Sequence, residues 1–216
     1  MDFAAARRNM VDRQVRTNKV TDEAVLEALG QVPRELFVSE GLRAAAYVDE
    51  GLPLGNGRYL IEPMVFARLL QAVEMKPTDL VLDLGCGSGY STAVLSRLAN
   101  MVVALECDRS LARRTSATLG ELSIDNAVVV EGPLEQGWPA QAPYNAVLLG
   151  GAAARVPDAI LGQLAEGGRL AGVETHGGVG RAVLYLNQRG VISARPLFDA
   201  EVPMLPGLAA EPSFVF

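Results

Sequence analysis

The chain has 216 residues, of which half are hydrophobic and 20% are charged, and its formal net charge is −6. This length fits one ordinary domain, and the acidic balance argues against a nucleic-acid-binding surface, which normally shows a basic patch. No window reaches about 18 uninterrupted apolar residues, the length that a membrane span needs, and the N-terminus lacks the apolar run of a signal peptide. We therefore expect a soluble cytoplasmic protein that binds neither nucleic acid nor membrane.

Residues 1–61 are expected to form a helical segment on the substrate side of the protein. Residues 3–17 carry apolar side chains at helical spacing, and a second helix is predicted to begin after a cap at Thr21 and to end at Pro33. Turn-forming residues follow, up to the stretch GNGRYLIEP at 55–63. The two glycines of this stretch indicate a loose turn ahead of a helix.

From residue 62 onward, apolar strands alternate with helices. A helix is predicted over 63–74, with Pro63 at a first-turn position. The strands predicted after it are DLVLDLG, MVVALE, NAVVVEG, YNAVLLGGA and RLAGVE. The helices between them are YSTAVLSRLA, SLARRTSATLGEL and PDAILGQLAEGG, the last one ended by Gly167 as a C-cap. Residues 181–198 read as two further strands around a turn near 188–190.

This alternation predicts an α/β fold. Parallel strands joined by helices form a sheet covered on both faces, and the final strand pair adds antiparallel strands at one edge. We expect a doubly wound sheet in which residues 62–216 form one compact unit behind the N-terminal segment. Ligands of such folds bind at the carboxyl ends of the strands.

The segment VLDLGCGSGYSTAVL, residues 81–95, is a strand, a glycine loop and a helix. Gly85 permits a tight turn, and Gly87 and Gly89 let the backbone approach a ligand closely. The start of the following helix offers free N–H groups and a partial positive charge. The loop therefore predicts a ligand site.

The spacing of the glycines distinguishes two classes of ligand. Dinucleotide-binding folds favour G-x-G-x-x-G, but the sixth position here is Tyr90. The pattern G-x-G-x-G after Asp83 instead resembles the first motif of the S-adenosylmethionine-dependent methyltransferases, where this acid helps to position the methionine part of the cofactor. Glu106 closes the next strand, and the separation (106 − 83) is 23 residues. We expect Glu106 to bind the ribose hydroxyls, as the acid about 20 residues on does in dinucleotide folds.

Five ordered segments of the chain match one family pattern. MVDRQVRTNKVTDEAVLEALGQVPRELFV matches N-terminal helices and a "VPRE.FV" turn, AYVDEGLPLGNG matches "AY.D.PLPIG.G", and LDLGCGSGY matches "LEIGTGSGY". GWPAQAPYNAVLLGGAA matches "GWPE.APYDAIIVTAA", and LAEGGRLAGVE matches "LKPGGRLV.PV". From about Met10 to about Leu205 the chain resembles the protein-L-isoaspartate O-methyltransferase family. The resemblance implies a Rossmann-like methyltransferase fold and methylation of isoaspartyl carboxylates for protein repair.

The residues that this resemblance assigns to S-adenosyl-L-methionine lie in the glycine loop and after the next two strands. They are Asp83, Gly85, Cys86, Gly87, Ser88, Gly89, Glu106, Cys107, Pro133 and Leu134. No catalytic base is needed, because a carboxylate with an ordinary pKa near 4 is already a nucleophile at neutral pH. Two cysteines and one histidine are too few for a familiar zinc site, so we expect reduced thiols and no metal.

The stretch at 55–63 departs from the family pattern G-H-G-Q-T-I-S-Q-P. Arg58 replaces the glutamine, Tyr59 the threonine and Ile61 the serine that lies beside the substrate carboxylate. A lost hydrogen bond to a charged group is worth about 1.5–3 kcal/mol, or roughly 10- to 150-fold in rate. The catalytic residue is therefore unknown, with Arg58 and Tyr59 as candidates, and Arg58, Tyr59, Leu60 and Ile61 form the expected substrate side.

Further departures are Pro133 in place of an acid that contacts adenine, Asn145 in place of an aspartate, and Gly150 in place of a threonine. We expect these changes to cluster around substrate and adenine. Three hypotheses remain open: an isoaspartyl methyltransferase, a family member with a different carboxylate or small-molecule acceptor, and a non-catalytic protein that binds S-adenosylmethionine. Turnover of any acceptor separates the third from the first two.

Overall fold

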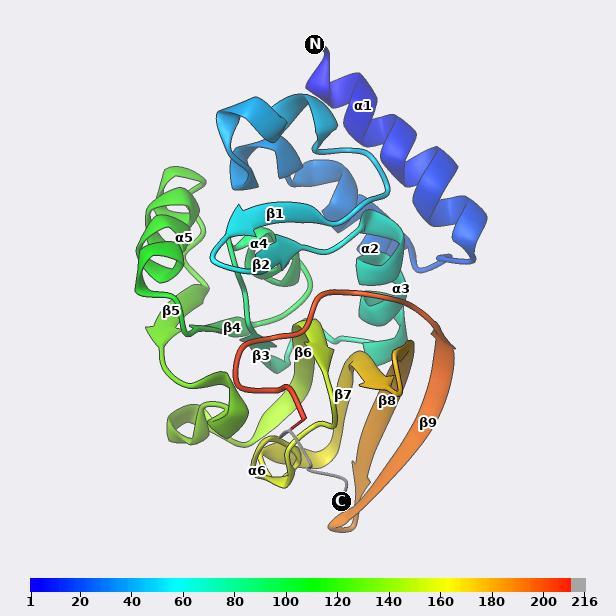
Figure 1. Cartoon of the computed structure of the whole chain (residues 1–216), viewed down its shortest axis with the longest axis vertical. Coiled ribbons are helices and arrows are strands. Elements are labelled where there is room, and N and C mark those ends of the chain that lie inside the picture. Colours follow the sequence, from blue (N-terminus) through cyan, green and yellow to red (C-terminus); the bar gives the residue numbers. More distant parts are fainter. Residues whose placement is uncertain (211–216) are drawn as a thin grey trace, which may run out of the picture.

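A seven-stranded sheet forms the centre of the protein, whose residues 1–210 are described by a computed structural model. The strand order is β5-β4-β3-β6-β7-β8-β9 (Figure 1). The strands are β3 (Leu80–Leu84), β4 (Met101–Glu106), β5 (Ala127–Glu131), β6 (Tyr144–Ala153), β7 (Leu164–His176), β8 (Val179–Gln188) and β9 (Val191–Asp199). The first five in this order run parallel, and β8 and β9 are added antiparallel at one edge. The predicted doubly wound sheet with an antiparallel edge is confirmed.

Helices cover the sheet and form the N-terminal segment. They are α1 (Phe3–Met10), α2 (Glu23–Gln31), α3 (Pro63–Val73), α4 (Tyr90–Leu95), α5 (Arg109–Glu121) and α6 (Asp158–Leu161). A π-helical turn (Val11–Val15) and a 3₁₀ turn (Arg16–Asn18) continue α1, so the chain is helical over most of the predicted range 3–17. Further 3₁₀ turns lie at Arg34–Phe37, Glu40–Ala45, Leu134–Gln136 and Pro139–Gln141.

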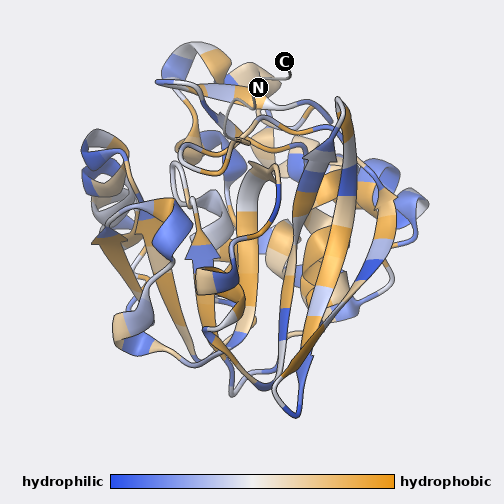
Figure 2. Cartoon of the chain, turned by 60° about the horizontal axis from the view of Figure 1, so that its bottom comes forward, coloured by the Kyte–Doolittle hydropathy of each residue, from blue (hydrophilic) through white to orange (hydrophobic). Residues whose placement is uncertain are grey.

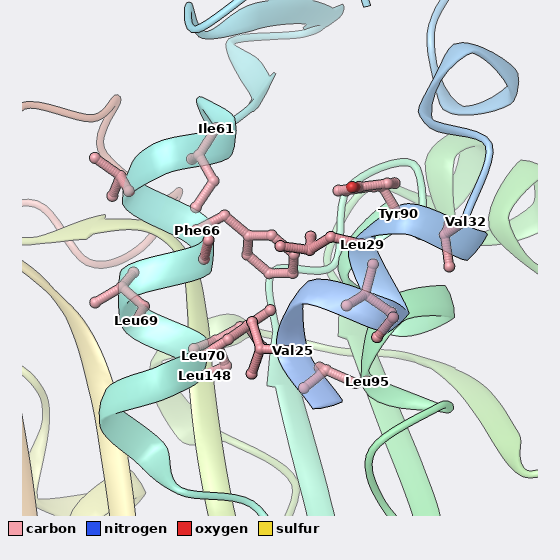
Figure 3. Close-up of a cluster of buried hydrophobic side chains, with 14 of the residues drawn as sticks. Val25, Leu29, Val32, Ile61, Phe66, Leu69, Leu70, Tyr90, Leu95 and Leu148 are labelled. Carbon is pink, nitrogen blue, oxygen red and sulfur yellow. The ribbon is translucent and has the colours of Figure 1, made fainter. Parts of the chain in front are cut away.

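Alternate residues of the buried strands face opposite sides of the sheet. In β3, Val81 packs into the cluster under α2, α3 and α4, whereas Leu82 packs on the face that α6 covers. Hydrophobic residues follow the strands of the sheet in Figure 2. Figure 3 shows part of the first cluster, where side chains of α2, α3 and α4 meet Leu148 of β6. This packing fixes β3 and α4, and with them the loop that joins the two.

Two local predictions are wrong. The cap of α2 is Asp22 and not Thr21, because the Asp22 carboxylate accepts hydrogen bonds from the N–H groups of Ala24 and Val25. The helix expected over PDAILGQLAEGG is only the four residues of α6. The chain joins β7 at Leu164, which pairs with Tyr144, and Gly167 (φ +72°) lies in a bulge of that strand. Pairing with β6 therefore overrides the local helical pattern.

A hairpin of β1 (Leu52–Gly55) and β2 (Arg58–Leu60) was not predicted. Its turn residues Asn56 and Gly57 both have positive φ, +51° and +73°, as a type I′ turn requires. In Figure 1 the hairpin lies between the N-terminal helices and the carboxyl ends of β3 and β4. The stretch at 55–63 is therefore a turn, a strand and the entry to α3, placed over the glycine loop.

Candidate active site

The loop between β3 and α4 is the centre of the site. Gly85, Gly87 and Gly89 have φ values of +78°, +58° and +89°, a backbone region that residues with a Cβ rarely adopt. The N–H groups of Gly85 and Cys86 both donate to the carbonyl of Leu105, at 2.8 and 3.1 Å. The glycines therefore bring the loop backbone against the carboxyl end of β4.

Asp83 is fully buried near the carboxyl end of β3. Its Oδ2 accepts 2.7 Å hydrogen bonds from the hydroxyls of Ser91 and Thr92 in α4. Its Oδ1 is buried and has no hydrogen-bond partner within residues 1–210. Burial raises the pKa of Asp83 to about 6, and the two hydroxyl hydrogen bonds offset part of that rise. At neutral pH Asp83 is thus mostly a carboxylate with one unpaired oxygen.

Glu106 is the last residue of β4 and is also fully buried. Its Oε2 accepts a 2.8 Å hydrogen bond from the N–H of Gly87. Its Oε1 accepts from the N–H groups of Cys107 and Asp108, at 2.9 and 3.0 Å. Three backbone donors therefore fix this carboxylate beside the glycine loop, on the neighbouring strand to Asp83.

Arg58 of β2 reaches the same carboxylate. Its Nη2 donates to Oε2 of Glu106 at 2.9 Å and to the carbonyl of Gly85 at 2.8 Å, and its Nε lies 3.4 Å from Oε1 of Glu106. Only 3% of Arg58 is exposed. The guanidinium therefore closes the site from the hairpin side and faces Glu106.

The other residues expected on the substrate side surround a small cavity. Tyr59 is partly exposed, whereas Leu60 and Ile61 are buried. A cavity of about 20 Å³ lies between them and the glycine loop, room for about one water molecule. Its wall includes Arg34, Tyr59, Ile61, Cys86, Tyr90 and Gly150. In Figure 3, Ile61 lies above Phe66 at the start of α3, across from Tyr90.

Ile61 belongs to the hydrophobic core as well as to the cavity wall. Arg34 is completely buried in the same wall, where Nη2 donates to the carbonyl of Ile61 at 2.6 Å and the guanidinium carbon lies 4.7 Å from the centre of the Tyr90 ring. Its Nη1 has no hydrogen-bond partner within residues 1–210. The cavity therefore combines an apolar wall with one buried cation.

Of the remaining predicted residues, Leu134 is buried and Pro133 is exposed just after β5. Like Glu106, they lie at the carboxyl ends of the parallel strands, because Glu131 of β5 pairs with Glu106 of β4. Burial raises the pKa of Cys86 well above its usual value and that of Cys107 to about 11. Both thiols are therefore protonated at neutral pH and are unsuited to act as nucleophiles.

Asn145 and Gly150 were both expected to lie near substrate and adenine. The expectation is wrong for Asn145, whereas Gly150 lies beside the glycine loop. Asn145 lies at the start of β6, where its Oδ1 accepts from the N–H of Leu80 at the start of β3. Asn145 therefore lies at the amino ends of the parallel strands, and the glycine loop lies at their carboxyl ends. Gly150 does face the loop, since a Cβ built there would lie 2.2 Å from the carbonyl oxygen of Gly85. A threonine side chain has no room at this position.

The chemistry of these residues fits S-adenosylmethionine. The unpaired oxygen of Asp83 and the buried, unpaired hydroxyl of Ser88 (within residues 1–210) are free to bind polar groups, and Glu106 stands where an acid binds ribose in related folds. The space above the loop is filled, however, by the chain itself. A Cβ on Gly85 would meet Leu205 at 2.7 Å and one on Gly87 would meet Leu54 at 2.9 Å.

Sequence reasoning missed Thr115 and Leu205, which both contact the glycine loop. Thr115 of α5 donates a 2.9 Å hydrogen bond to the carbonyl of Gly87, and Leu205 reaches Gly85 because the C-terminal segment pairs with β6 through Ala152. No local pattern marks either contact, since both join segments that are distant in the sequence. The hairpin did carry a signal, because the dipeptide Asn56-Gly57 is a strong indication of a tight turn between two strands.

Comparison with known proteins agrees with the geometry. Residues 5–179 match the family described as protein-L-isoaspartate(D-aspartate) O-methyltransferase. A protein-L-isoaspartate O-methyltransferase from Roseiflexus castenholzii is 38% identical over 211 residues, which cover 97% of this chain and 96% of the relative. One from a Synechococcus strain is 44% identical over 168 residues, covering 78% of this chain and 69% of the relative.

Solved structures share the fold. A protein-L-isoaspartate O-methyltransferase superposes with a TM-score of 0.82 at 24% identity, covering 94% of this chain and 67% of that one. A Plasmodium falciparum structure described as the same enzyme, in complex with S-adenosyl-L-homocysteine, has a TM-score of 0.80 at 20% identity and covers 92% of this chain and 97% of that one. None of the helices within residues 1–210 has the length and apolar character that crossing a membrane requires.

Proposed function

Because the chain belongs to the protein-L-isoaspartate(D-aspartate) O-methyltransferase family, we propose that it methylates the carboxylate of isoaspartyl residues in proteins or peptides, with S-adenosyl-L-methionine as the methyl donor. Such a step serves protein repair. The observation that carries the proposal is the family match over residues 5–179, in which Asp83, the glycine loop and Glu106 stand together at the carboxyl ends of β3 and β4.

The residues have separable roles in this proposal. Asp83 and Ser88 take the methionine part of the cofactor, Gly87 gives it room, and Glu106 takes the ribose. S-adenosylmethionine supplies an electrophilic methyl group on a sulfonium sulfur. The acceptor carboxylate is ionised at neutral pH, so the protein needs to align it and not to deprotonate it.

The wall around the cavity would perform that alignment. Ile61 and Tyr90 exclude water from the carboxylate, and the buried Arg34 supplies a positive charge whose Nη1 has no hydrogen-bond partner within residues 1–210. Charge-assisted hydrogen bonds of this kind are about twice as strong as neutral ones. Residues 1–61 contribute Arg34, Leu54, Tyr59, Leu60 and Ile61 to this wall, which supports their assignment as the substrate-side segment. That division of the chain, like a cytoplasmic location, stays a prediction.

The experiment that tests the proposal is transfer of labelled methyl from S-adenosylmethionine to an isoaspartyl peptide, with the aspartyl peptide of the same sequence as control. Cofactor binding is measured on the same preparation by calorimetry. Isoaspartyl-selective transfer is the expected result. Binding without transfer to either peptide would contradict the proposed acceptor, and absence of binding would contradict the assignment of the glycine loop.

A further inference from the structure

The turn of the β1–β2 hairpin is fastened to the candidate cofactor site at two points. Arg58 forms the ion pair with Glu106 at 2.9 Å. Two residues earlier, the side-chain amide of Asn56 donates a 2.7 Å hydrogen bond to Oδ2 of Asp108. Glu106 ends β4 and Asp108 lies two residues beyond it, so the hairpin turn and the start of β2 hold both ends of a short segment beside the glycine loop.

The Arg58 guanidinium takes hydrogen-bonding positions on the Glu106 carboxylate that a ligand would need. The backbone N–H groups of Gly87, Cys107 and Asp108 already use one direction of each carboxylate oxygen. Arg58 uses another, with a nitrogen directed at each oxygen. Two neighbouring ribose hydroxyls would present the same pair of donors to the same carboxylate. The guanidinium and the ribose cannot both hold this position.

The hairpin also fills the space in front of the loop. Leu54 of β1 stands where any group added to Gly87 would lie, at 2.9 Å, and Nη2 of Arg58 stands 3.1 Å from a Cβ on Gly85. The cavity on the other side of the loop, which Glu106 does not line, has a volume of only about 20 Å³ and holds about one water molecule. A nucleoside therefore enters only if the hairpin turn leaves Glu106.

We propose that Arg58 is an internal competitor for the ribose position on Glu106, and that the β1–β2 turn is a latch that must open before S-adenosylmethionine binds. This inference rests on the proposed function, because it takes S-adenosylmethionine as the ligand. It assigns Arg58 to cofactor access and not to the acceptor carboxylate. The apparent affinity for the cofactor is then lower than that of the open form, by an amount that the stability of the closed latch sets.

The test compares dissociation constants for S-adenosylmethionine and S-adenosylhomocysteine by isothermal titration calorimetry. The first variant is Arg58→Gln, which removes the charge and keeps a polar side chain. The second is Asn56→Asp, an exposed change that sets two carboxylates against each other while keeping a residue tolerant of positive φ. The matched control is Arg169→Gln, which breaks an arginine–carboxylate pair with Asp79 at the opposite edge of the sheet. Thermal unfolding verifies that each variant is folded.

Arg58→Gln is expected to bind both ligands at least about 10-fold more tightly than the unmodified chain, since one charge-assisted pair no longer competes. Asn56→Asp is expected to tighten binding by a smaller factor, and Arg169→Gln to leave it unchanged. Equal affinity of Arg58→Gln and the unmodified chain, or weaker binding by Arg58→Gln, would overturn the latch while leaving the proposed function intact. If no folded variant binds either ligand, the proposed function fails together with the latch.

Discussion

The hydroxyl of Thr92 donates a 2.7 Å hydrogen bond to Oδ2 of Asp83, and the other oxygen of this buried carboxylate has no partner within residues 1–210. A buried charge with unmet hydrogen-bonding capacity costs free energy of folding. The raised pKa of Asp83, about 6, expresses that cost. A buried carboxylate with a perturbed pKa favours a binding role, in agreement with the proposed function.

Asp83 predicts a pH dependence of stability. Its pKa in the folded chain, about 6, is above the ordinary value of 3.8, so the folded state binds more protons between about pH 4 and pH 6. Stability therefore falls as the pH rises through this window, by about 3 kcal/mol in total. In Asp83→Asn this loss is absent. In urea unfolding at pH 4 to 7, the free energy of unfolding of the variant should increase relative to that of the unmodified chain as the pH rises.

The same variant should lose function while it gains stability. Asp83→Asn is expected to bind S-adenosylmethionine at least about 10-fold more weakly, because a charged hydrogen-bond acceptor is removed. Asp125→Asn, an exposed change outside the loop, serves as the control for both measurements. Parallel stability curves for Asp83→Asn and the unmodified chain would show that Asp83 does not carry the pH effect.

Two glycine-to-alanine variants separate the effect of lost space at Gly87 from the effect of backbone strain. Gly87→Ala places a Cβ 2.9 Å from Leu54, at φ +58°, whereas the Cβ of Gly167→Ala, at φ +72°, meets no atom of residues 1–210 within 4 Å apart from its chain neighbours. Both variants should lose about 1–2 kcal/mol of stability, since an L-residue is strained in this region. Only Gly87→Ala should also lose binding of S-adenosylmethionine, measured by calorimetry. Equal binding by the two variants would remove Gly87 from the cofactor site.

The sheet could be predicted from the sequence because each buried strand is a continuous apolar run with a turn at each end. Asp83 and Glu106 could be predicted for a related reason: each lies at or near the carboxyl end of a parallel strand, where register brings the two strands together. The start of β7 could not, because Leu164 is held in the strand by its pairing with Tyr144. Local propensity favours a helix there.

No local sequence pattern predicts that Arg58 pairs with Glu106. Arg58 and Glu106 are 48 residues apart, and the cationic side chain suits an acceptor carboxylate as well as it suits Glu106. The hairpin that carries Arg58 toward Glu106 was marked by Asn56 and Gly57, a signal that the interpretation as a loose turn left unused. With the hairpin recognised, the choice between the two carboxylates still depends on tertiary packing.

Ile61 predicts opposite changes in activity and stability. It is 5% exposed and packs in the core, beside the cavity. Ile61→Ser restores a hydroxyl next to the acceptor position and should raise isoaspartyl methylation by roughly 10-fold. It should also lower stability by about 2–5 kcal/mol, through the cavity it leaves. Ile61→Ala is the control with a similar cavity and no hydroxyl. If it raises activity as much as Ile61→Ser does, the hydroxyl is not the cause.

The close packing of β6 against the glycine loop leads to a prediction for Gly150. A Cβ at this position would lie 2.2 Å from the carbonyl oxygen of Gly85, an atom of the backbone that cannot turn aside as a side chain does. Gly150→Ala should therefore displace the loop, lowering stability by about 1–3 kcal/mol and weakening cofactor binding. The control is the exposed change Gly30→Ala in α2, whose added Cβ meets no atom of residues 1–210 within 4 Å outside the helix's own backbone. It should raise stability by about 0.5–1 kcal/mol. Denaturant unfolding measures both variants. A stability gain in Gly150→Ala as well would mean that the loop moves freely away from β6, and that the close approach of Gly85 to Gly150 does not limit the size of the site.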